Sequence, residues 1–199
     1  SGKGSNLEPW KRHIREWTER YPICPDNYFR EDSVNPYVFV HEFSALLGED
    51  IPVVVDTGCA IAWMMQAFRP KRGQRVIHDF NNTAMGYALP GSIGASLARE
   101  GRPVVCVTGD GSLQINIQEL ATVIHYKLPV KIILFNNRGY SMIQQTQDQW
   151  LGSKYIASSP EGGLPVPDFG KIAQAYGYRT WTIRKNSEVH KALREVLAQ

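Results

Sequence analysis

Short apolar runs alternate along most of the chain with longer runs that have helical spacing. The short runs are rich in β-branched residues and predict strands at 51–56, 74–79, 102–107, 129–135 and 178–183. Apolar residues that recur every three to four positions predict helices at 36–47, 59–67, 86–99, 113–127, 139–149, 168–176 and 187–197. Apolar strands that alternate with helices are typical of a parallel sheet. We therefore expect an α/β fold, a parallel sheet with helices on both faces.

The first 35 residues do not follow this alternation. Residues 8–22 have helical spacing, with Trp10, Ile14, Trp17 and Tyr21 on one side, and Pro22 ends the run. Residues 1–6 are small and polar and are typical of a tag remnant, and a loop follows the helix. We therefore expect a tag remnant, a helix and a loop in residues 1–35, and one α/β domain in residues 36–199.

Composition excludes several classes of protein. A net charge of +3 with scattered basic residues argues against nucleic acid as a partner, and no apolar stretch is long enough to span a membrane. Cys24, Cys59 and Cys106 are odd in number and far apart, which favours neither a disulfide framework nor a zinc site. We expect a cytoplasmic protein that binds neither nucleic acid nor a membrane.

Polar or glycine-bearing segments follow four of the predicted strands, at 56–58, 79–85, 108–112 and 136–140. The carboxyl ends of parallel strands meet at one edge of a sheet, and ligands of such folds bind there. We therefore expect the functional site at this edge.

One of these segments holds Asp110 between Gly109 and Gly111, where a strand meets a helix. Glycine lets the backbone approach a ligand closely, and a helix start favours phosphate. A carboxylate beside a phosphate requires a cation between them, and Asn137 follows the next predicted strand. Carboxylate, amide and carbonyl oxygens are the ligands that Mg²⁺ prefers. Gly-Asp-Gly alone, or Asn-Asn alone, usually marks a turn. The prediction of a magnesium site therefore rests on their order, with Gly-Asp-Gly after one strand and Asn-Asn after the next.

The stretch GDGSLQINIQELATVIHYKLPVKIILFNN resembles the diphosphate-binding signature of thiamine diphosphate enzymes, and it is most similar to the acetolactate synthase (acetohydroxyacid synthase) family. The likeness extends upstream through NNTAMGYALPGSIGAS and VVVDTGCAIAWMMQA. The opening PWKRHIREWTERYP resembles the linker helix that follows the middle domain of those enzymes. This resemblance implies the thiamine diphosphate-binding fold, with thiamine diphosphate and Mg²⁺ as cofactors.

The resemblance also implies residue roles. Asp110, Asn137 and the carbonyl of Gly139 would bind Mg²⁺. Met85 would bend the cofactor and the Thr83 carbonyl would accept a hydrogen bond from its amino group, so both are candidate catalytic residues. The candidate cofactor-binding residues are Thr57, Gly58, Cys59, Ala60, Ile61, Ala62, Thr83, Met85, Gly109, Asp110, Gly111, Ser112, Asn137, Gly139, Tyr140, Ser141 and Met142. Ile143 would line the pocket, and His78 and Asp79 are weaker candidates for contact with substrate.

The activity implied by the resemblance is decarboxylation of pyruvate, or of another 2-oxo acid, with transfer of the two-carbon unit to a carbonyl acceptor. A simple 2-oxo acid decarboxylase and an inactive binding module of the same fold are the alternatives. The glutamate that activates the cofactor would come from the pyrimidine-binding domain of a second subunit, in a homodimer or homotetramer. The chain alone is therefore expected to be inactive, and the family pattern places one more strand after residue 199.

The sequence departs from the family in the helix after the asparagines. Biosynthetic acetolactate synthases carry a tryptophan there, and the equivalent position here is Thr146. A small hydroxyl, with Gln144, Gln145 and Gln147 beside it, would make the acceptor pocket roomier and more polar. We expect an acceptor other than 2-oxobutyrate, such as a keto sugar.

Overall fold

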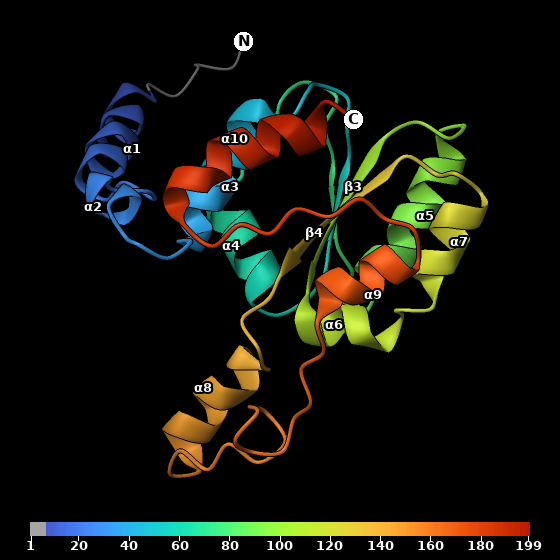
Figure 1. The fold of residues 1–199 in the computed structure, drawn as a ribbon. Coiled ribbons are helices and arrows are strands. Elements are labelled where there is room, and N and C mark those ends of the chain that lie inside the picture. Colours follow the sequence, from blue (N-terminus) through green and yellow to red (C-terminus); the bar gives the residue numbers. More distant parts are fainter. Residues whose placement is uncertain (1–6) are drawn as a thin grey trace.

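The computed structural model describes residues 7–199, and its centre is a four-stranded parallel sheet of order β2-β1-β3-β4 (Figure 1). The strands are β1 (Val53–Val55), β2 (Val76–Ile77), β3 (Val104–Gly109) and β4 (Val130–Phe135). All of β1 and nearly all of β3 are buried, because helices cover both faces of the sheet. The α/β fold expected from the sequence is confirmed. The tag remnant expected at residues 1–6 lies outside the described residues.

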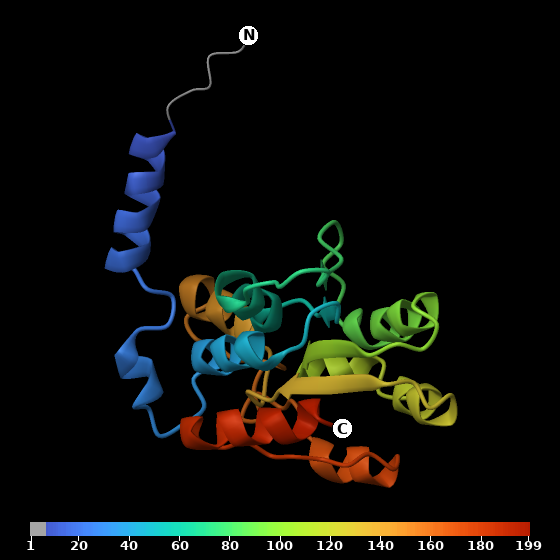
Figure 2. The ribbon, with the colours of Figure 1, turned by 90° about the horizontal axis from the view of Figure 1, so that it is seen from above.

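Two groups of helices enclose the sheet (Figures 1 and 2). The helices on one face are α3 (Pro36–Leu46), α4 (Cys59–Ala67) and α10 (Asn186–Leu197). Those on the other face are α5 (Ala88–Ala98), α6 (Asp110–Ile115), α7 (Glu119–His125) and α9 (Phe169–Ala175). Each group forms its own apolar core against the strands, one containing Phe43 and Met64, the other Leu89 and Leu120. These two cores hold the strand ends in fixed positions.

The remaining helices lie away from the sheet (Figure 1). They are α1 (Glu8–Arg20), α2 (Asp26–Phe29) and α8 (Ser141–Trp150). The helix expected near the amino terminus is confirmed as α1, which has no buried residue; its Trp10 and Trp17 rings pack edge to face at 5.7 Å. The short α2 lies within the segment expected to be a loop. No described helix has both the length and the apolar character of a membrane span.

The prediction of one continuous helix at 113–127 is wrong. The segment forms two helices, α6 and α7, with a break between them. The side chain of Asn116 donates to the Gly86 carbonyl at 2.8 Å, and Asn116 ends α6. Asparagine favours such a side-chain bond over the interior of a helix. The break therefore connects α6 to the turn that contains Gly86.

The strand expected at 178–183 is also absent from the described structure. The segment has no strand residues and does not join the ladder, which ends at β4. It is fixed instead by Tyr178, whose hydroxyl donates to the Leu120 carbonyl at 3.2 Å. A strand needs backbone partners, and apolar alternation in the sequence does not supply them.

Candidate functional site

The strand register brings the four expected segments to one edge of the sheet. Val55 pairs with Val107, and Gly109 pairs with Phe135, so the residues that follow these strands emerge side by side. The expected meeting of these segments at the carboxyl edge is confirmed.

Asp110 is the first residue of α6 and is 5% exposed. Its Oδ1 accepts from the Gly111 N–H at 2.7 Å, and its Oδ2 accepts from the Gly139 N–H at 3.1 Å. Burial raises the pKa of this carboxyl, and the backbone hydrogen bonds partly oppose that effect. No ion pair within residues 7–199 involves Asp110. A buried carboxylate without a cationic partner is costly, so this site fits a bound cation.

Asn137 and Gly139 offer two further oxygens beside Asp110. The Asn137 side-chain N–H donates to the Ser141 hydroxyl, and no donor among the described residues bonds its Oδ1 or the Gly139 carbonyl. A Cβ at Gly139 would lie 2.5 Å from the Ser158 carbonyl oxygen, so only glycine fits this close approach. A carboxylate, an amide and a carbonyl oxygen are a donor set suited to Mg²⁺.

The start of α4 lies at the same edge of the sheet, because α4 follows β1. Gly58 precedes the helix with a φ of +80°, and the N–H groups of Cys59, Ala60 and Ile61 have no acceptor within residues 7–199. Burial raises the pKa of the Cys59 thiol, and the charge of Asp110 raises it further. Free N–H groups at a helix start favour a phosphate group.

The start of α6 holds two other expected phosphate contacts, Gly111 and Ser112. The Gly111 N–H already donates to Asp110, and a Cβ on Gly111 would lie 2.0 Å from the Tyr140 ring. The Tyr140 ring therefore covers the start of α6, while Ser112 is buried. The roles of Gly111 and Ser112 in binding the diphosphate stay predictions.

Asp56 is a residue of this edge to which the sequence assigned no role. This fully buried carboxylate accepts four hydrogen bonds. Its Oδ1 accepts from the Thr57 and Gly86 N–H groups, both at 3.0 Å. Its Oδ2 accepts from the Ala88 N–H and the Thr108 hydroxyl, both at 3.1 Å. Asp56 thus connects the ends of β1 and β3 to the turn before α5. In the sequence, an acidic residue directly after the apolar run VVV was the one feature that could have indicated this role.

Met85 lies in that turn and is 39% exposed. Gly86, with a φ of +82°, follows it, and a Cβ there would lie 2.9 Å from the Asn116 side chain. Hydrogen bonds from Gly86 to Asp56 and from Asn116 to Gly86 hold both sides of the turn. Met85 is therefore a partly exposed apolar side chain on a turn whose backbone is held by hydrogen bonds.

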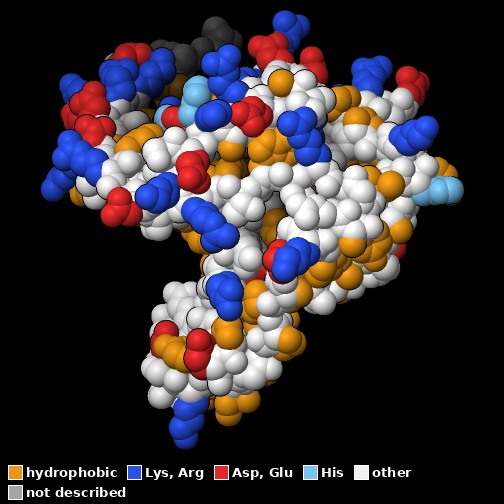
Figure 3. All heavy atoms as spheres, in the orientation of Figure 1, with side chains coloured by type: hydrophobic (Ala, Val, Ile, Leu, Met, Phe, Trp, Pro, Cys, Tyr) orange, Lys and Arg blue, Asp and Glu red, His pale blue; other side chains and the backbone are white. Residues whose placement is uncertain are grey.

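The segment around α8 forms a lobe that projects from the main body (Figures 1 and 3). Gln144 donates to the Ser158 carbonyl, and Gln147, which is buried, donates to the Ile156 carbonyl at 3.1 Å. The expectation that these two glutamines make the pocket polar is wrong, because both hold the following loop against α8. Met142, Ile143 and Thr146 are exposed on the helix.

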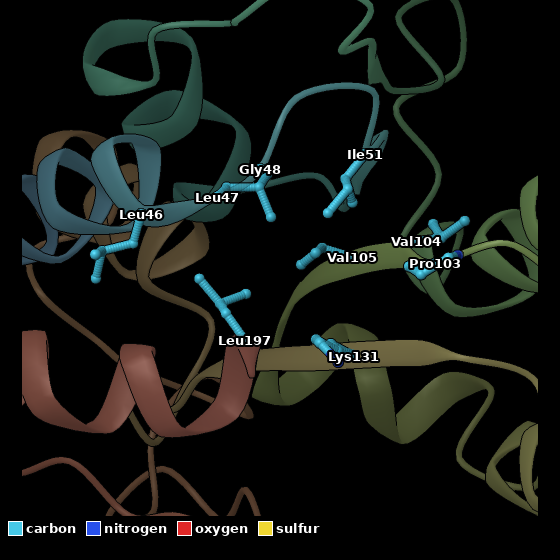
Figure 4. Close-up of a pocket in the computed structure, with 9 residues that line it drawn as sticks. All are labelled: Leu46, Leu47, Gly48, Ile51, Pro103, Val104, Val105, Lys131 and Leu197. Atoms are coloured by element: carbon cyan, nitrogen blue, oxygen red, sulfur yellow. The ribbon is translucent and has the colours of Figure 1, made fainter. Parts of the chain in front are cut away.

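A cavity at the opposite, amino-terminal edge of the sheet does not belong to this site (Figure 4). Ile51, Pro103 and Val105 lie on one side of it and Leu197 on another, and its one charged residue, Lys131, donates to the Gln199 carbonyl at 2.9 Å. It therefore offers no group free for chemistry.

Comparison with known proteins gives one family match. Residues 56–199 match the family "Thiamine pyrophosphate enzyme, C-terminal TPP binding domain". The chain is 34% identical to the acetolactate synthase large subunit of Pyropia yezoensis, over 92% of this chain and 30% of that protein. It is 31% identical to the acetolactate synthase isozyme 3 large subunit of Escherichia coli (strain K12), over 97% of this chain and 33% of that protein. The chain thus spans about a third of the length of these relatives.

Proposed function

The chain belongs to the thiamine pyrophosphate enzyme family, as its C-terminal TPP binding domain, and from this premise we propose that it holds the diphosphate and Mg²⁺ of thiamine diphosphate in a carboligase. The whole enzyme would decarboxylate pyruvate and transfer the two-carbon unit to a carbonyl acceptor. The proposal rests on the carboxylate of Asp110, which is buried and has no ion-pair partner among the described residues. Beside it lie the Asn137 Oδ1 and the Gly139 carbonyl oxygen, which accept no hydrogen bond within residues 7–199.

Each group at the edge has a distinct task in this proposal. Asp110, Asn137 and the Gly139 carbonyl would hold Mg²⁺, and the N–H groups at the start of α4 would bind the diphosphate. Thiamine diphosphate, when bound, supplies a nucleophilic carbon and an electron sink.

The turn before α5 would orient the reactive end of the cofactor. The exposed Met85 offers an apolar surface against which a bent cofactor can pack, and the Thr83 carbonyl would accept a hydrogen bond from its amino group. This backbone is fixed through Asp56 and Asn116, so neither contact requires the protein to reorganise.

Release of carbon dioxide from pyruvate by the full-length enzyme tests the proposed function. We expect release that requires both thiamine diphosphate and Mg²⁺, together with a condensation product. Release with free acetaldehyde as the product would favour the simple decarboxylase instead. Binding without any release would favour an inactive module.

The 199-residue chain alone should not turn over pyruvate. We propose that its partner is the pyrimidine-binding domain of a second subunit, in a cytoplasmic homodimer or homotetramer, and that this domain supplies the activating glutamate. Assay of the purified chain with both cofactors should give no carbon dioxide above the background without protein. Measurable release would show that this domain needs no partner.

Thr146 should control the choice of acceptor. Its exposed side chain lies one turn from Met142, whose carbonyl accepts from the Thr146 hydroxyl at 3.1 Å, so a larger side chain fits without disturbing the core. In the full-length enzyme, Thr146→Trp should raise the preference for 2-oxobutyrate over a keto sugar about ten-fold, since an indole narrows the pocket. Gln149→Trp, at an exposed position of the same helix that has no expected role in the pocket, is the matched control. An equal effect of both variants would contradict a specific role of Thr146.

A further inference from the structure

The loop 78–82, here called the rim loop, carries a set of exposed groups that the cofactor site does not use. It follows β2 and leads into the turn with Met85, so it lies at the same edge of the sheet. Phe80 is 59% exposed, and Asn81 and Asn82 are exposed beside it. Neither asparagine side chain has a hydrogen-bond partner within residues 7–199. The rim loop thus presents one aromatic ring and two free amides.

Hydrogen bonds hold the rim loop in one conformation. The Thr83 N–H donates to the Asp79 carbonyl at 2.7 Å, and the Asn82 N–H donates to the Asp79 carboxylate at 3.3 Å. Thr83 itself has a φ of +49°. A loop that is fixed before binding loses little entropy when it binds a ligand, so its exposed groups are suited to recognition.

His78 anchors the other end of the loop. Its Nδ1 lies 2.9 Å from the Val55 carbonyl, and a carbonyl only accepts, so Nδ1 carries the proton. No hydrogen bond within residues 7–199 involves the other ring nitrogen, Nε2. The imidazole also packs edge to face with Phe80, with 4.8 Å between the ring centroids, which fixes the orientation of the aromatic ring.

The charge of this region disfavours a carboxylate ligand. Residues 78–86 include one acid, Asp79, and no lysine or arginine. A 2-oxo acid acceptor bound here would place its carboxylate near Asp79 without a cation. A neutral ligand with hydroxyl groups matches the two amides and the imidazole nitrogen, and the C–H face of a sugar ring matches the negative face of Phe80.

We propose that the rim loop is the acceptor-binding platform, with Phe80 stacked on the ring of a keto sugar and Asn81, Asn82 and His78 bonded to its hydroxyls. This inference rests on the proposed carboligase function and names the acceptor class of the same site. His78 and Asp79, which the sequence left as weaker candidates for substrate contact, belong to this loop.

Phe80→Ala and Asn81→Ala/Asn82→Ala in the full-length enzyme test the proposal. The probes are a neutral 4-keto hexose and 2-oxobutyrate. Each variant should lower kcat/KM for the sugar about ten-fold relative to 2-oxobutyrate, and weaken the calorimetric Kd of the sugar about ten-fold. Phe80→Trp should retain binding, and Phe80→Leu should not, because leucine keeps apolar volume but has no aromatic face.

Tyr126→Ala is the matched control for Phe80→Ala. Tyr126 is 66% exposed and packs edge to face with His125, again with 4.8 Å between the centroids, but it follows α7 at the opposite edge of the sheet. This control should leave both measurements at the wild-type value.

Three results would overturn the proposal. They are a wild-type preference for 2-oxobutyrate over the sugar, an effect of Phe80→Ala no larger than that of Tyr126→Ala, and a wild-type enzyme that releases no carbon dioxide from pyruvate. The third also overturns the proposed function, whereas the first two leave it intact.

Discussion

Replacement of Asp110 by alanine is expected to abolish Mg²⁺-dependent binding of thiamine diphosphate by the full-length protein. Asp110 is the one carboxylate that the site directs toward the proposed metal, and its charge has no ion-pair partner among the described residues. Loss of a metal ligand should weaken cofactor affinity on the order of 100-fold or more. At a cofactor concentration about 100 times the wild-type Kd, about 2.7 kcal/mol of ligand stabilisation should disappear.

Thermal unfolding with and without Mg²⁺ and thiamine diphosphate measures this effect. The cofactor-free midpoint of Asp110→Ala should change little, because loss of two backbone hydrogen bonds is offset by removal of a desolvated charge. Asp110→Asn keeps the volume and loses the charge, so it should also lose most of the cofactor response. Asp32→Ala, at an exposed position, is the control. Unchanged cofactor affinity in Asp110→Ala would mean that the GDG motif is only a turn.

The sequence predicted the location of the candidate site because the carboxyl ends of all strands in a parallel sheet lie at one edge. Asp110 and Asn137 follow consecutive strands, β3 and β4, and these pair directly in the sheet. The strands and helices were also predictable, because the spacing of apolar residues along the chain indicates which side chains are buried. These features are local, so a short window of sequence contains them.

The bonds that fix the site could not be predicted, because they join residues far apart in the chain. Asn116 bonds to Gly86, and that bond splits the helix expected at 113–127. Gln147 bonds to the loop after α8, whereas its position in the sequence suggested a polar pocket wall. Asp56 bonds to backbone groups about 30 residues later, and nothing in its local sequence specifies them. The type of a side chain determines which hydrogen bonds it can form, whereas the fold determines which groups it bonds to.

Asp56→Ala should cause the largest loss of stability of any substitution considered for this chain. It would leave the Gly86 and Ala88 N–H groups and the Thr108 hydroxyl without their acceptor in a buried position. An unpaired buried donor costs about 1–3 kcal/mol, so we expect a loss of about 3–5 kcal/mol in the free energy of unfolding. Urea unfolding of the 199-residue chain measures it.

Thr108→Val is the matched control because it removes one of the four bonds and keeps the shape. It should cost about 1 kcal/mol, and a loss for Asp56→Ala no larger than this would contradict the role of Asp56 as the centre of the network. Asp56→Asn distinguishes stability from function. Its amide oxygen can still accept from Thr57 and Gly86, while its N–H₂ group faces the Ala88 N–H. The resulting displacement of the turn before α5 should lower kcat of the full-length enzyme more than cofactor affinity, since the proposed metal ligands, which follow β3 and β4, stay in place while Met85 moves.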